Sequence, residues 1–148
     1  MKIADILAAK DATTHWVGHD QDFSMALKKM HHANIGSIVV IHSETGALLG
    51  LISQPEILAG LASFGNKALG HCSTGIMRKP SPVCNPGDDV KAVMRRMTQE
   101  RNRHVVVTLG DEILGVISIG DLVAAQLQEA HLEAGVLRDM ARSHLLSA

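Results

Sequence analysis

An internal repeat is the feature that most constrains how this chain can fold. The stretch Gly-Val-Ile-Ser-Ile-Gly-Asp at residues 115–121 has a near copy, Gly-Leu-Ile-Ser-Gln-Pro-Glu, at residues 50–56. Each copy indicates a buried strand that turns directly into a helix, which would begin near Ser118 or Ser53. Two copies of one strand-to-helix junction within 148 residues predict that the chain consists of two versions of one unit.

The sequence also predicts the same amphipathic helix twice, once before each junction. Apolar residues recur at i, i+3, i+4 and i+7 in two places: Phe23, Ala26, Leu27 and Met30, and then Val90, Val93, Met94 and Met97. Each residue of the second set lies 67 positions after its counterpart in the first. Basic pairs at 28–29 and 95–96 occupy the opposite side of both helices. The pattern predicts one face packed on a core and one solvated face.

The remaining segments complete a β-α-β-β-α unit in each half. Strands are predicted at residues 16–17, 37–41 and 48–52 in the first half and at 82–83, 104–107 and 113–117 in the second. The middle runs are continuously β-branched, which is typical of strands covered on both faces. A single unit would leave an apolar sheet face exposed. We therefore predict an α+β fold in which residues 1–68 and 69–130 pack sheet against sheet.

The apolar pattern after the second junction continues beyond its own half. We predict one long helix over residues 121–146, with an apolar stripe formed by Leu127, Ala130, Ala134, Leu137 and Ala141. A helix that outlasts its domain needs a surface against which to bury such a stripe. A second copy of the chain would provide one, which predicts a homodimer. The alternative is a helix folded back on its own domain.

Composition excludes several classes of partner. The net charge of −1 provides no overall attraction to nucleic acid or an anionic membrane, and the scarcity of aromatic residues excludes the usual base-stacking platforms. Apolar runs are too short to span a bilayer, and the first residues lack the apolar core of a signal peptide. Cys72 and Cys84 form no metal-binding motif and indicate free thiols. We expect a soluble, cytoplasmic protein.

Neither a metal site nor a catalytic centre is expected. On a helix the adjacent His31 and His32 would point about 100° apart, which suits no single ion. No serine or cysteine sits in a nucleophile elbow, there is no Walker loop, and His104 has no orienting acid nearby in the sequence. We predict that the protein is not an enzyme.

The junction at Ser118 allows two interpretations. In the first, Ser118 and Asp121 form a capping box that satisfies free N–H groups of the helix and has no further role. In the second, the helix N-terminus receives an anion, Ser118 contacts phosphate or ribose, and Asp121 accepts hydrogen bonds from a ribose diol. Arg103 and His104, at the start of the preceding strand, could then hold phosphate charge. Spacing in the sequence does not decide between the two.

Both halves resemble a CBS domain. The resemblance rests on Arg-His-Val-Val-Val at 103–107 followed by the junction at 115–121, and on Ile-Gly-Ser-Ile-Val-Val at 35–40 followed by Gly-Leu-Ile-Ser at 50–53. Together they resemble a stand-alone CBS domain pair (a Bateman module) over essentially residues 1–130. The resemblance implies two β-α-β-β-α units packed by their sheets around a pseudo-twofold axis, in a module that commonly dimerises.

The resemblance also implies a ligand and a site. CBS pairs bind adenosine-containing ligands such as AMP, ADP, ATP, NAD(H) or S-adenosylmethionine in clefts between the units, and they act as regulatory sensors. In this chain Ser118 would contact phosphate or ribose and Asp121 would hold the ribose hydroxyls. Ser81, Val83 and Ile117 would flank the base, partly through main-chain atoms.

The first half departs from the family pattern. Glu56 stands where the motif has Asp, and Pro55 stiffens the turn before it. A longer carboxylate would reach past a ribose or fill the cleft itself. We therefore expect one competent site, in the second half, and treat Ser53 and Glu56 as a weak second site whose role is structural.

Three functions remain, in order of preference. The first is a sensor that binds an adenine nucleotide and signals to an unknown regulated protein by a change of conformation or assembly. The second is a structural interaction module whose cleft is vestigial. The third is nucleic-acid binding by a cluster of basic residues in the second half, formed by Arg78, Lys79, Arg95, Arg96, Arg101 and Arg103.

Overall fold

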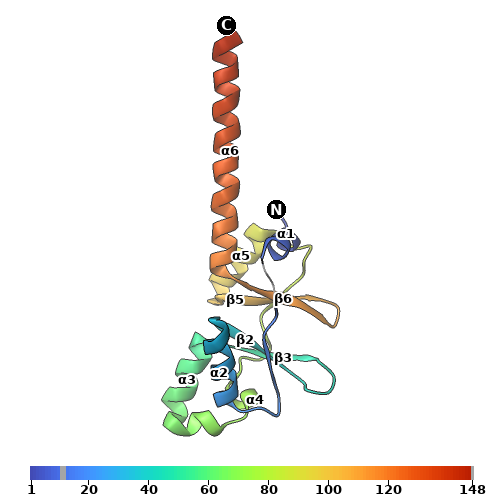
Figure 1. Ribbon diagram of the computed structural model, residues 1–148, viewed down its shortest axis with the longest axis vertical. Helices are drawn as coiled ribbons and strands as arrows, with labels where there is room; N and C mark the ends of the chain where they lie inside the picture. Colours follow the sequence, from blue (N-terminus) through green and yellow to red (C-terminus); the bar gives the residue numbers. More distant parts are fainter. Residues whose placement is uncertain (11–12, 148) are drawn as a thin grey trace.

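The computed structural model describes residues 1–10 and 13–147 and shows the same succession of elements twice (Figure 1). The first half contains β1 (Trp16–Gly18), α2 (Phe23–Ala33), β2 (Ser37–Ile41), β3 (Leu48–Ser53) and α3 (Gln54–Phe64). The second contains β4 (Val83–Cys84), α5 (Val90–Glu100), β5 (His104–Leu109), β6 (Glu112–Ser118) and α6 (Ile119–Ser147). The predicted α+β class and the β-α-β-β-α order of each half are therefore confirmed.

Each half forms a three-stranded sheet of the same design. The middle strand pairs in parallel with the short first strand and antiparallel with the third, which gives the orders β1-β2-β3 and β4-β5-β6. Both hairpins carry a register shift at the equivalent place, after Val40 in β2 and after Val107 in β5. The repeat seen in the sequence thus extends to the position of a backbone irregularity.

The two sheets pack face to face because their middle strands are apolar on both sides. In β2 the two residues that flank Val39 lie in the core with α2, whereas Val39 itself lies on the other face of the sheet. In β5 the two residues that flank Val106 lie in the core with α5, and Val106 lies on the other face. Val39, Leu51 and Val106 meet in a buried cluster between the sheets.

The short helices that precede the two halves each pack on the other half. Three short elements complete the chain: α1 (Ile3–Ala9), the 3-10 helix η1 (Gly65–Gly70) and α4 (Ser73–Ile76). Ile3 and Ile6 of α1 are buried in the core of the second half, whereas Ile76 of α4 lies in the core of the first. Figure 1 shows α1 beside the second sheet and α4 beside the first. The chain therefore crosses between the halves, which the order of elements does not reveal.

The last helix, α6, is much longer than the unit that it closes. It begins at Ile119, directly after Ser118, and runs for 29 residues, with Leu122 of its first turn fully buried. Beyond its first turns it stands clear of both sheets (Figure 1), so the predicted long helix is confirmed. None of the helices in the described part of the chain is long and apolar enough to cross a membrane.

Replacing Leu51 by alanine should destabilise the chain, because Leu51 is 2 % exposed and lies in the cluster between the sheets. Truncating such a buried leucine lowers the free energy of unfolding by about 2–5 kcal/mol. The matched control is Leu58→Ala on α3, where the leucine is 59 % exposed, and it should change stability by about 0.5 kcal/mol or less. Urea denaturation measures both variants. Equal losses of stability in the two variants would show that a residue of the inter-sheet cluster contributes no more than an exposed one.

Candidate functional site

A cleft of about 400 Å³ lies between the two halves, where β6 meets α6. Three segments line it: the chain before β1 (Lys10, Thr13, Thr14, His15), the connection from α2 to β2 (Ala33, Ile35, Gly36, Ser37) and the second sheet (His104, Gly115, Val116, Ser118). Its walls therefore come from both halves of the chain.

At one side of this cleft, Ser118 and Asp121 form a reciprocal capping box at the start of α6. The Asp121 N–H donates to Ser118 Oγ at 3.1 Å, and the Ser118 N–H donates to Asp121 Oδ2 at 2.9 Å. Both bonds satisfy donors at the helix N-terminus. The first interpretation of the junction is thus present in the structure. The second interpretation is compatible with this geometry, because Asp121 Oδ1 accepts no hydrogen bond within the described chain.

Lys10 brings a positive charge to this junction from the other end of the chain. Its Nζ lies 2.8 Å from Asp121 Oδ2 and donates to the carbonyl oxygen of Val116 at 2.9 Å. Lys10 directly follows α1, so the crossing of α1 onto the second half places it there. Partial burial raises the pKa of Asp121, but hydrogen bonds from Lys10 and Ser118 outweigh it, and the pKa lies below the usual 3.8. The carboxylate is therefore charged at neutral pH.

His104 faces the cleft as a neutral, partly buried ring. Burial lowers its pKa below the usual 6.5; Lys10 lowers it further, and Asp121 opposes the shift. Its Nδ1 is buried and has no hydrogen-bond partner within the described chain, although buried nitrogens nearly always have one. Gly36 lies beside the ring: a Cβ at residue 36 would be 3.4 Å from His104 Nε2, an ordinary van der Waals contact.

Five of the predicted site residues lie at or near this cleft. Ser118 and His104 line it, and Asp121 adjoins it through the capping box. The side chain of Ile117 is fully buried in the core of the second half, which leaves only its main chain for a ligand. Arg103 is exposed beside the junction, and its carbonyl oxygen accepts from the N–H of the first residue of α6 at 2.8 Å.

Ser81 and Val83 lie elsewhere. They line a second groove, of about 440 Å³, together with Arg78, Lys79, Pro80, Pro82, Arg96, Glu100 and Asn102. In the second sheet β5 separates β4 from β6, so Val83 is two strand spacings, roughly 10 Å, from β6. The structure therefore does not bring the predicted base-flanking pair to Ser118.

Residues 13–15 line the cleft in the way predicted for Ser81 and Val83. Strand pairing makes Trp16 the counterpart of Val83, so residues 13–15 are the first-half counterpart of residues 80–82. The repeat in the sequence already implies that residues 13–15 correspond to residues 80–82. A repeat alone does not show which copy of a segment packs beside which junction, and for this reason the segment was missed.

The junction of the first half is closed by its own side chains. Ser53 Oγ donates to Glu56 Oε1 at 2.8 Å, and the Ser53 N–H donates to the same oxygen at 3.2 Å. Glu56 is one methylene longer than Asp121 and reaches both donors. The Ser53 hydroxyl also accepts from the N–H of Glu56, as the Ser118 hydroxyl accepts from that of Asp121. Neither Ser53 nor Glu56 lines the two grooves described above. The arrangement favours a structural role, which stays a prediction.

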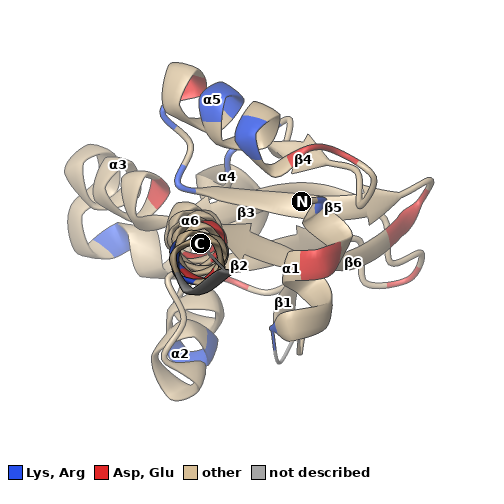
Figure 2. Ribbon diagram, turned by 90° about the horizontal axis from the view of Figure 1, so that it is seen from above, with Lys and Arg blue, Asp and Glu red and all other residues tan. Residues whose placement is uncertain are grey.

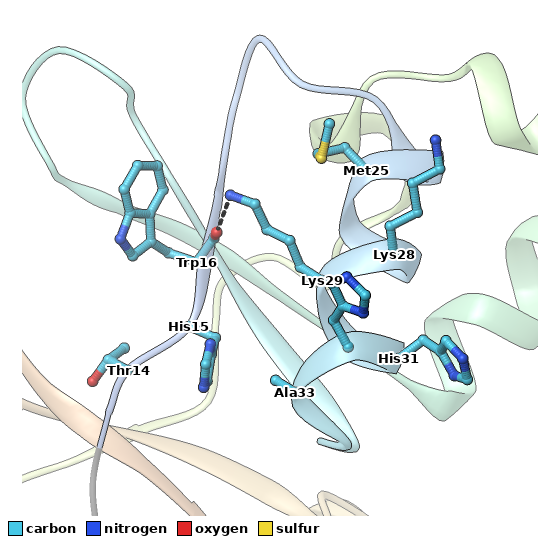
Figure 3. Close-up of a pocket in the computed structure, with 9 residues that line it drawn as sticks. Thr14, His15, Trp16, Met25, Lys28, Lys29, His31 and Ala33 are labelled. Carbon is cyan, nitrogen blue, oxygen red and sulfur yellow. Dashed lines mark hydrogen bonds between the residues drawn. The ribbon is translucent and has the colours of Figure 1, made fainter.

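A larger groove, of about 940 Å³, opens beside the cleft along α2 (Figure 3). We call it the α2 groove; its walls are Thr14, His15, Trp16, Met25, Lys28, Lys29, His31, His32 and Ala33. Lys29 Nζ donates to the Trp16 carbonyl oxygen at 2.9 Å and lies 4.7 Å from the centre of the Trp16 ring. Three of its walls, Thr14, His15 and Ala33, also line the cleft. No pattern in the sequence indicated this groove.

The CBS domain family model matches this chain twice, at residues 4–63 and 73–128. Among curated proteins, the chain is 29 % identical over 134 residues to the mitochondrial CBS domain-containing protein CBSX3 of Arabidopsis thaliana. That match covers 86 % of this chain but 65 % of the relative, so the chain spans slightly less than two thirds of the relative's length.

Solved structures show the same fold. A CBS-domain containing protein from Agrobacterium tumefaciens is 29 % identical, with a TM-score of 0.80 over 85 % of this chain and 99 % of that one. A CBS domain protein from Pyrobaculum aerophilum, complexed with AMP, is 20 % identical, with a TM-score of 0.72 over 82 % of this chain and 89 % of that one. At the latter identity the likeness shows the fold alone.

Lowering the pH should remove the stability that the Lys10–Asp121 pair contributes. Because the pKa of Asp121 is depressed on folding, this contribution is complete above 3.8 and is lost as the pH falls through the lower folded pKa. Both side chains are about one-third exposed, so the pair should be worth about 1 kcal/mol or less at pH 7. Thermal unfolding of wild type and Asp121→Asn should therefore differ at neutral pH and converge in acid. A difference that stays constant across this range would contradict the assignment.

Proposed function

The chain belongs to the CBS domain family, and we propose that it acts as a regulatory sensor that binds an adenosine-containing nucleotide in the cleft between its halves. One observation carries the proposal: the Ser118 hydroxyl and the Lys10 ammonium line one cleft, and the N-terminus of α6 and the Asp121 carboxylate adjoin it. These are groups that phosphate and ribose require. The cleft volume also falls within the range of small-molecule sites, about 300–1,000 Å³.

In this proposal the phosphate lies near the start of α6. The dipole of the helix favours an anion there, and Lys10 adds a positive charge. Ser118 provides a hydroxyl beside the helix end. Arg103, exposed next to the junction, would reach phosphate at the opening of the cleft. His104 would contribute a hydrogen bond and not a charge, since its pKa is lowered.

Asp121 would hold the ribose. Its Oδ2 is taken by Lys10 and by the Ser118 N–H, whereas Oδ1 is free to accept from a ribose hydroxyl. The base would then lie toward residues 13–15 and the apolar side chains of Ala33 and Ile35, which line the same cleft. Residues 13–15 thereby replace Ser81 and Val83 in the proposed site.

The candidate ligands are AMP, ADP, ATP and NAD(H). The Pyrobaculum protein of the same fold is complexed with AMP, which supports an adenine nucleotide without selecting one. We assign the chain no catalytic step. Its output would be a change of conformation or assembly, conveyed through a homodimer to a regulated protein that neither the sequence nor the fold names. A cytoplasmic location stays a prediction, and the Arabidopsis relative is a mitochondrial protein.

A thermal-shift panel with AMP, ADP, ATP, NAD, NADH and S-adenosylmethionine, with guanine nucleotides as controls, tests the proposal. A ligand at 100 times its Kd should add about 2.7 kcal/mol to the free energy of unfolding. Asp121→Ala should abolish the ligand-induced shift, because the ribose loses its acceptor. Glu56→Ala, the equivalent change in the first half, should preserve it.

Protein for this panel must be shown by mass spectrometry to be free of nucleotide. A shift that persists unchanged in Asp121→Ala would place the ligand elsewhere. No shift with any compound would leave the structural interaction module, with a vestigial cleft, as the better account.

A further inference from the structure

The free part of α6 carries an exposed apolar row on one side. Leu132, Val136 and Met140 follow one another every four residues and are 67 %, 58 % and 63 % exposed. Residues at this spacing lie above one another on one face of a helix. We call them the outer row. An exposed apolar surface of this kind marks a contact site for another protein surface.

The border of the outer row is acidic. Glu129, Glu133 and Asp139 each lie three positions from one of its members and are therefore its neighbours on the helix surface. The two arginines of this part of α6, Arg138 and Arg142, are not three or four positions from any member of the row. His144 lies four positions from Met140, so the outer row is an apolar strip whose edges are acidic except near its C-terminal end.

The α2 groove has the complementary character. Trp16 and Met25, which are 47 % and 37 % exposed, provide an apolar surface. Its other walls include Lys28 and Lys29 together with three histidines, and none of the described residues that line it is acidic. Figure 3 shows the two lysines and Met25 on α2, opposite Trp16, and Figure 2 shows the basic residues of α2 on the outside of the molecule.

We propose that the outer row of α6 from one copy of the chain docks into the α2 groove of a second copy. The apolar row would cover Trp16 and Met25, and the acidic border would face Lys28 and Lys29. One chain cannot make this contact with itself, because its α6 points away from the first half (Figure 1). The outer row begins roughly 20 Å beyond the start of α6, a reach that places it on a neighbouring molecule. Exchange of two helices closes a twofold dimer.

Charge selects the outer row over the stripe predicted from the sequence. His131 and Arg138 lie three or four positions from Ala134, a member of that stripe, whereas Glu133 is the one acidic residue at this spacing from any member. The border of the stripe is therefore mainly basic or titratable. Docking that side of α6 into a groove lined by lysines and histidines would bring like charges together. The homodimer is therefore retained, but its contact uses the other side of the helix.

This contact would also reach the proposed nucleotide cleft. Thr14, His15 and Ala33 line both the α2 groove and the cleft, so a docked helix would touch residues that a ligand also contacts. Nucleotide binding and assembly would then be linked, in either direction. The linkage rests on the proposed function, whereas the dimer contact does not.

Disulfide trapping tests the contact directly. A Cys72→Ser background removes the exposed thiol, and Cys84 is buried, with its pKa raised by burial to about 11, so it reacts poorly. In this background, Met25→Cys chains mixed with Val136→Cys chains should give a covalent dimer on mild oxidation, and neither should do so alone. Leu137→Cys, on the adjacent residue, is the control partner for Met25→Cys. Equal trapping through Leu137→Cys, or self-trapping of Val136→Cys alone, would overturn the proposal.

Sedimentation velocity on the full chain provides the second test. Val136→Lys should weaken the dimer by about tenfold or more, since it brings a positive charge into a basic groove. Leu137→Lys should leave the dimer unaffected, and lysine preserves the helix in both variants. A chain that is monomeric at every concentration, or a dimer that survives Val136→Lys, would contradict the contact. Nucleotide-free wild type should still dimerise, because the contact does not need the ligand, and this separates a failed dimer from a failed nucleotide site.

Discussion

The contact between the two sheets, through Val39, Leu51 and Val106, is the interaction on which the rest of the structure depends. Each sheet is covered by helices on one face only, and the other face is apolar and would be exposed in a single half. Packing the sheets together buries both faces and leaves the helices outside. It also brings the ends of the two sheets side by side, so the cleft at Ser118 is a consequence of how the core is formed.

The exchange of α1 and α4 between the halves joins the core to the site. Ile3 and Ile6 anchor α1 on the second half, and Lys10, which ends this segment, is thereby held against Asp121. Asp121 consequently serves several structural purposes at once, as the cap of α6 and as the partner of Lys10. In the proposed function a ribose would add to this set of bonds. A ligand would therefore act on the same groups that fix the start of α6.

The two junctions have diverged in a way that chemistry explains. In the first half the longer Glu56 takes up the hydroxyl and the N–H of Ser53, and α3 ends after 11 residues at Gly65, where φ is 58°. In the second half the shorter Asp121 leaves one carboxylate oxygen free and α6 continues for 29 residues. The open cleft and the long helix thus occur at the same junction. This arrangement suits a module in which binding at the base of a helix affects what the helix contacts.

The sequence by itself determined the local structure of this protein. Apolar periodicity decides which face of a helix or strand is buried whatever its partner is, so the two amphipathic helices, the doubly covered strands, the capping box at Ser118 and the long last helix were all predictable. Only the tertiary structure decided what meets at the cleft. Lys10 and Asp121 are 111 positions apart, and residues 13–15 line the cleft where Ser81 and Val83 were predicted. Both repeats carry the same local pattern, so the pattern does not determine which copy of a segment packs beside which junction. That choice depends on the path of α1 across the second core, which also places Lys10 beside Asp121.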